Sequence, residues 1–161
     1  MPARLTRRIA VALAFTAGLG VTVANAADEP ANIVKYRKAF MSANAAHLTM
    51  IAAVVKGEVS FSDDVAAHAH ALAEQGELLN ANLQRLFPEG TGKGSEVDTA
   101  ALPVIWDKWS EFEQHAQKLE EESAKLAQVA DSGDMAALGQ QLGAIGKLGC
   151  GGCHETFREK K

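Results

Sequence analysis

The chain has 161 residues, with 16 Lys and Arg against 20 Asp and Glu and a formal net charge of −4. This length suits one domain after any targeting segment is removed. The surplus of acidic residues argues against a nucleic-acid-binding protein, which needs a basic surface for phosphates.

Residues 1–26 are typical of a cleaved secretory signal peptide. A basic start precedes an apolar stretch over residues 9–23, and Ala24-Asn25-Ala26 forms a small-residue cleavage site. The apolar stretch is short and a cleavage site follows it, so a retained membrane helix is disfavoured. We therefore expect cleavage after Ala26, export by the secretory route and a periplasmic location.

The mature chain, residues 27–161, is then expected to be a single domain with no membrane span. The signal peptide removes three arginines and no acidic residue, which leaves 13 basic and 20 acidic side chains and a net charge of −7. Such a charge suits a soluble carrier that meets periplasmic redox proteins through complementary patches.

The first half of the mature chain predicts two helices. One runs from Pro30 to Lys56 and ends at Gly57. The next begins at Ser62, an expected N-cap, and ends before Pro88. Apolar residues in the second helix are spaced alternately by four and three, a heptad pattern typical of helical bundles.

The second half predicts a long glycine-containing loop and two more helices. The loop covers residues 88–101, and the third helix runs from Leu102 to Gly133 with an unbroken heptad pattern. Asp134 is expected to cap the fourth helix, which continues to a basic end at residues 158–161. The expected fold is all-α, an antiparallel up-down-up-down four-helix bundle.

The fourth helix contains Cys150-Gly151-Gly152-Cys153-His154, and C-x-x-C-H is the attachment signature of c-type haem. Two thiols add to the haem vinyl groups, while the adjacent imidazole binds the iron. Cys150, Cys153 and His154 would project to one side of a helix. The alternatives are a redox C-x-x-C motif or half of a zinc site, but the chain has no second cysteine pair and no βαβ pattern. We therefore expect one covalent haem c near the C-terminal end of helix four, with His154 as the proximal ligand.

Helix one offers a candidate for the other side of the iron. Met41 lies about 11 residues into it, or roughly 16 Å along the axis, and His154 lies roughly 9 Å from the end of the antiparallel helix four. Met50 is over 13 Å higher on the same helix, and Met135 lies at the far end of helix four. Met41 is thus the best-placed thioether ligand, although ordinary core packing is the alternative.

Arg37 precedes Met41 by one turn and could contact a haem propionate, with a solvated position as the alternative. Trp106, Trp109 and Phe112 have the spacing of core residues and would line a haem inside the bundle. The remaining histidines are expected at surface or partly buried positions and not as ligands. They are His47, His68, His70 and His115.

Over residues 30–161 the chain resembles the class II c-type cytochromes. The resemblance rests on the terminal C-x-x-C-H motif, supported by Tyr36-Arg37, Val55-Lys56-Gly57 and Ile105-Trp106. One branch, cytochrome c′, has a five-coordinate iron that binds nitric oxide or carbon monoxide. The other, cytochrome c-556-like branch has a methionine ligand. Met41 at the distal position and Leu86-Phe87-Pro88-Glu89 before the loop make this chain resemble the low-spin branch more.

The resemblance implies a periplasmic one-electron carrier with a His/Met-ligated haem, not an enzyme. Its alternative is a cytochrome c′-type protein that binds nitric oxide or carbon monoxide, which is favoured if Met41 only packs. The chain is expected to be a monomer or a homodimer. Peroxidase-like turnover is disfavoured because no histidine is placed as a distal acid/base group.

Overall fold

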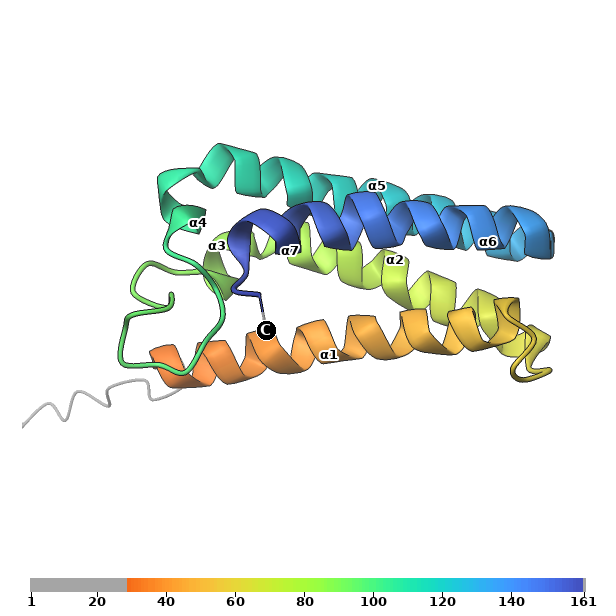
Figure 1. Cartoon of the computed structure of the whole chain (residues 1–161), viewed down its shortest axis with the longest axis horizontal. Helices are drawn as coiled ribbons and strands as arrows, with labels where there is room; N and C mark the ends of the chain where they lie inside the picture. The colour runs from red at the N-terminus through yellow and green to blue at the C-terminus, as the bar shows by residue number, and fades with distance from the viewer. Residues whose placement is uncertain (1–28, 161) are drawn as a thin grey trace, which may run out of the picture.

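The computed structural model describes residues 29–160, so the predicted signal peptide and its cleavage site lie outside the described residues. Long helical segments run side by side (Figure 1): α1 (Pro30–Val55), α2 (Val65–Ala81), α5 (Trp109–Ser132) and a composite of α6 (Met135–Ala144), η3 (Ile145–Gly151) and α7 (Gly152–Phe157). The shorter elements are η2 (Ser62–Asp64), α3 (Leu83–Leu86) and α4 (Val104–Asp107). The predicted all-α four-helix bundle is confirmed.

Helix ends follow local chemistry where the chain offers the required residue. Gly57 and Gly133 have φ of 73° and 70°, the left-handed conformation that ends α1 and α5. Asp134 caps α6, since its carboxylate accepts from the backbone N–H groups of Ala136 and Ala137 at 3.0 Å each. The prediction of Ser62 as an N-cap was wrong: it opens the short 3₁₀ turn η2 and makes no side-chain capping bond.

Two predicted helices are interrupted. The second breaks at Asn82, between α2 and α3, and the third breaks at Lys108, between α4 and α5. The heptad pattern does not reveal these breaks because apolar residues on both sides still face the core: Leu79 and Leu83 are 5% exposed. Each break is a local reorientation that preserves the buried face.

The expected basic helical end was also wrong. Helix α7 stops at Phe157 because Arg158 is extended and pairs with Ala101 in an antiparallel bridge. The amide of Leu102 donates to Phe157 O at 2.9 Å, and that of Glu159 donates to Ala100 O at 2.8 Å. The C-terminal tail is therefore fastened to the end of the long loop.

The interior divides into two clusters along the bundle. The aliphatic core comprises Ile51, Val65, Ala69, Leu72, Leu126, Ala127, Leu138 and Ile145. The aromatic core comprises Leu79, Leu83, Leu86, Phe87, Ile105, Phe112, Ala116 and Phe157. Since Phe157 follows the C-x-x-C-H motif by three residues, the aromatic core lies at the motif end of the molecule.

Helices α2 and α5 approach each other closely at Gly76. A Cβ atom there would lie 2.5 Å from Ser123 Oγ and 3.0 Å from Glu120 Cα, so a larger residue would force the helices apart. Ser123 is completely buried, and its hydroxyl donates to the backbone oxygen of Glu120 at 3.0 Å. The glycine in the predicted heptad pattern therefore serves close packing.

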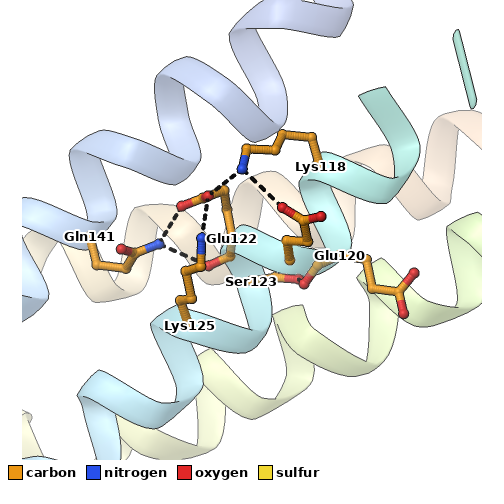
Figure 2. A network of polar contacts seen from close by, with 7 residues as sticks. Lys118, Glu120, Glu122, Ser123, Lys125 and Gln141 are labelled. Atoms are coloured by element: carbon orange, nitrogen blue, oxygen red, sulfur yellow. Dashed lines mark hydrogen bonds and ion pairs between the residues drawn. The ribbon is translucent and has the colours of Figure 1, made fainter. Parts of the chain in front are cut away.

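A buried carboxylate joins α5 to α6 (Figure 2). Glu122 is 4% exposed and pairs with Lys118 at 3.0 Å and Lys125 at 2.9 Å, while Gln141 Nε2 donates to it at 2.8 Å. Hydrogen bonds from Lys125, Gln141 and Lys118 lower the pKa of Glu122 to about 2. The carboxylate therefore stays charged and paired throughout the neutral range.

Among the described residues, only α1 is long and apolar enough to pass a length-and-composition test for a membrane span. Its most apolar window has a mean hydropathy of 1.2, and 6% of that window is buried. The same helix buries Arg37 and Ile51 and packs along α2, as a wall of a helical bundle does. The absence of a membrane span in the mature chain stays a prediction.

Candidate functional site

The C-x-x-C-H motif lies at the junction of η3 and α7. Residues 145–151 form a π-helical turn, a widened turn that often occurs at functional sites. Cys150 belongs to this turn, whereas Cys153 and His154 belong to the first turn of α7. The motif is therefore helical throughout, as the spacing predicted, but not within one uniform α-helix.

Glycines leave the approach to the motif open. Nothing lies within 4 Å of a Cβ atom built at Gly143 or Gly146, and both positions are exposed. Gly149 differs, because a Cβ there would lie 3.1 Å from Leu119 Cδ1 of α5. Gly149 therefore packs closely against α5, whereas Gly143 and Gly146 have no neighbour at the Cβ position.

The donor groups of the motif have the chemistry that covalent haem requires. Cys150 and Cys153 are free thiols, both half-buried. Burial raises the pKa of Cys150, and burial together with Cys150 raises the pKa of Cys153 to about 12. Desolvation and the positive charge of Arg158 lower the pKa of His154, which favours the neutral imidazole that ligates iron. Two unpaired thiols and a neutral imidazole fit a haem c site.

Met41 lies at the same end of the bundle as the motif. It is half-buried against the aromatic core, and Cys153 packs against that same cluster. Met50 and Met135 are 40% and 39% exposed, so neither competes with Met41 for a place in this region. The structure thus places Met41 near the level expected from helix geometry; ligation of iron by its sulfur stays a prediction.

Trp106, Trp109 and Phe112 also gather at this end. Phe112 belongs to the aromatic core and both tryptophans pack against it, as their spacing predicted. The indole N–H of Trp106 donates to Phe87 O at 3.1 Å, and that of Trp109 donates to Glu113 Oε1 at 2.6 Å. Their expected role as haem neighbours is compatible with this placement and stays a prediction.

Arg37 is directed at the long loop and not at solvent. It is 4% exposed, and its guanidinium donates to Leu86 O, Thr91 Oγ1, Thr91 O and Thr99 Oγ1 at 2.9–3.1 Å. Its Cζ also lies 4.4 Å from the ring centroid of Phe87. Burial lowers the pKa of Arg37 to about 10, so it remains charged at neutral pH. The alternative of a solvated position for Arg37 was wrong. Four of its five N–H donors are engaged in these contacts. The contact with a haem propionate stays a prediction.

His115 of α5 touches the motif, which the sequence did not indicate. A Cβ atom at Gly152 would lie 3.0 Å from its imidazole atoms Cε1 and Nδ1, and its ring centroid is 5.8 Å from that of Phe157. His115 follows the buried Phe112 by three residues and so lies on a neighbouring face of α5. That spacing is the one signal that could have placed it toward the motif.

Comparisons with known proteins point to one family. The family described as Cytochrome C′ matches residues 32–158. The chain is 41% identical to cytochrome c′ of Pararhodospirillum photometricum, with 81% of this chain and 98% of the relative covered. It is 33% identical to cytochrome c-554 of Cereibacter sphaeroides, with 94% and 96% covered.

Solved structures are similar as well. A nitric oxide complex of a mutant cytochrome c prime from Alcaligenes xylosoxidans has a TM-score of 0.70 at 30% identity and covers 83% of this chain and 98% of its own. A second cytochrome c′, described as having ligand-controlled dimer dissociation, has a TM-score of 0.73 at 25% identity and covers 82% and 98%. The chain therefore belongs to the cytochrome c′ family of class II c-type cytochromes, whose members carry covalently bound haem c.

Proposed function

We propose that the chain is an exported monohaem cytochrome that binds nitric oxide or carbon monoxide at an iron with an open or displaceable sixth position. Cys150 and Cys153 would hold the haem covalently and His154 would be its proximal ligand. When bound, the haem supplies the gas-binding iron. The protein contributes the axial imidazole, the apolar surroundings and the barrier to water.

The similarity to cytochrome c′ proteins carries this preference over a low-spin electron carrier, and the packing of Met41 is compatible with it. Met41 is half-buried against the aromatic core, so packing is a sufficient role for its side chain. A similar protein has been solved as a nitric oxide complex, and the 41% identical relative is named cytochrome c′. Together these observations favour the gas-binding alternative over the low-spin branch expected from the sequence.

A His/Met-ligated electron carrier is the second candidate. It is supported by the common placement of Met41 and Cys153 against the aromatic core, which brings a thioether to the motif end. The 33% identical relative named cytochrome c-554 shows that close relatives do not all carry the cytochrome c′ name. In either case the activity is ligand binding or one-electron exchange, with no catalytic residue assigned.

The proposed location is the periplasm, because c-type haem attachment accompanies export and residues 1–26 are typical of a signal peptide. Redox proteins of the same compartment would exchange electrons with the haem. A monomer or a homodimer is proposed, since one structural neighbour is described as a dimer that dissociates under ligand control.

Optical spectra of the purified holoprotein test the proposal. We expect a high-spin spectrum in both oxidation states and a shift of the ferrous spectrum on addition of carbon monoxide. Met41→Ala should bind carbon monoxide at least as readily as the wild type. Met50→Ala is the matched control, because Met50 lies on the same helix and is 40% exposed.

The opposite result is equally specific. A low-spin spectrum with a methionine–iron(III) charge-transfer band, unchanged by carbon monoxide in the wild type but responsive in Met41→Ala, would establish the electron carrier. Gas binding would then require loss of Met41, and the proposed function would be wrong.

A further inference from the structure

Two histidines that the sequence placed on separate helices meet between α1 and α2. His47 and His68 are both half-buried, and their Nδ1 atoms lie 3.1 Å apart. Their ring centroids are 5.2 Å apart and the ring planes are tilted by 49°. His70 points elsewhere, since its Nε2 lies 2.8 Å from Asp131 Oδ1 of α5. Neither His47 nor His68 belongs to the C-x-x-C-H motif, which lies on η3 and α7.

The spacing of the two nitrogens is the spacing of a chelate. For an ion bound at the usual 2.0–2.1 Å from both Nδ1 atoms, the Nδ1–metal–Nδ1 angle would be about 100°. This lies between the roughly 90° of adjacent square-planar positions and the roughly 109° of a tetrahedral site. Imidazole nitrogen is also a ligand that zinc and copper prefer. We propose that His47 and His68 form a transition-metal site that takes Zn²⁺ or Cu²⁺ through both Nδ1 atoms.

Without metal, the contact is a hydrogen bond in which one Nδ1–H donates to the other Nδ1. Metal binding needs both lone pairs, so the donating ring must move its proton to Nε2. Acid displaces the ion because protonated imidazole cannot ligate.

The proposed site has two protein ligands, so its other coordination positions are open to solvent. Among residues 29–160, no cluster of three or more His, Cys, Asp or Glu side chains is arranged to hold a metal. Solvent must therefore complete the coordination, which distinguishes this site from a closed structural zinc site with four protein ligands. The ion would join α1, which carries Met41, to α2 and stabilise the folded state increasingly as the free metal concentration rises above the dissociation constant.

Calorimetric titration with zinc chloride tests the proposal, on holoprotein that retains its haem but has been freed of other metal ions. We expect one equivalent of Zn²⁺ per chain at neutral pH, and at least tenfold weaker binding in His47→Gln and in His68→Gln. His70→Gln is the control, because His70 shares α2 with His68 but pairs with Asp131; its affinity should equal that of the wild type. The haem absorption spectrum of each variant verifies that the bundle is intact.

A measurement without substitution keeps the test decisive. In NMR spectra of the unsubstituted protein, zinc should shift the imidazole resonances of His47 and His68 and leave those of His70 in place. The proposal is overturned if the wild type takes up no equivalent of zinc below about 1 mM. It is also overturned if His47→Gln binds as tightly as the wild type, or if His70→Gln loses binding to the same extent.

Discussion

The two ends of the bundle are built differently. Around the aliphatic core the buried residues are Val, Ile, Leu and Ala, and all of them except Ile145, the first residue of η3, lie in the regular helices α1, α2, α5 and α6. Around the aromatic core the chain breaks at Asn82 and Lys108, widens into η3, and is covered by the loop before α4 (Figure 1). Regular packing thus supplies a rigid frame, and the irregular backbone is concentrated where the haem motif lies.

The largest effect is expected from a cavity in the aliphatic core. Leu126 is completely buried, and Leu126→Ala should lower the free energy of unfolding by about 3 kcal/mol. Because this residue belongs to the aliphatic core and not to the aromatic core that Cys153 packs against, the optical spectrum of the folded variant should match that of the wild type. Denaturant unfolding followed by circular dichroism measures the loss. Leu78→Ala is the control, since Leu78 is 54% exposed and should cost little.

A changed haem spectrum in Leu126→Ala would contradict this separation of the two ends. It would mean that the aliphatic core transmits its packing to the haem site, and that the two clusters behave as one unit.

A smaller but more local effect is expected from Arg37. Arg37→Gln would leave the backbone oxygens of Leu86 and Thr91 without their buried donor, at a cost of about 2 kcal/mol. Amide hydrogen exchange should accelerate in residues 88–101 and remain unchanged around Leu126. Lys38→Gln is the control, because Lys38 is half-exposed and pairs with the exposed Asp98.

Uniform acceleration of exchange across the bundle in Arg37→Gln would contradict a role confined to the loop. Arg37 would then contribute to global stability in the same way as a core residue.

The same contrast explains how much could be predicted from the sequence. Heptad spacing placed the long helices and the buried face correctly because that spacing repeats over many turns. It could not locate the breaks at Asn82 and Lys108 because the buried face continues through them. Leu79 and Leu83 are buried on either side of the first break, and Ile105 is buried just before the second. Periodicity records which face is buried and not whether the helix axis is continuous.

The site was predictable to the extent that its chemistry is local in sequence. The C-x-x-C-H spacing predicts Cys150, Cys153 and His154 as the haem residues. Counting turns predicted Met41 at the motif end, where it packs against the same cluster as Cys153. The partners of Arg37 are 49 to 62 residues away along the chain, and Thr91 and Thr99 lie in an irregular loop with no periodic signal. The contact between His47 and His68 depends on the packing of two helices, which no single helix pattern encodes.

The smallest effect, and the finest test of the motif end, comes from its glycines. A methyl group at Gly152 would press against the His115 imidazole at 3.0 Å, whereas one at Gly146 would meet nothing within 4 Å of the protein. Gly152→Ala should therefore cost about 1 kcal/mol, and Gly146→Ala should be neutral or slightly stabilising, because alanine is the better helix former. Adding His115→Ala to Gly152→Ala should restore part of the loss, a coupling that thermal unfolding of the two single variants and the double variant measures.

Equal and additive effects at both glycines would mean that the contact with His115 does not constrain the motif. The cost at Gly152 would then reflect only the π-helical backbone of the adjoining turn.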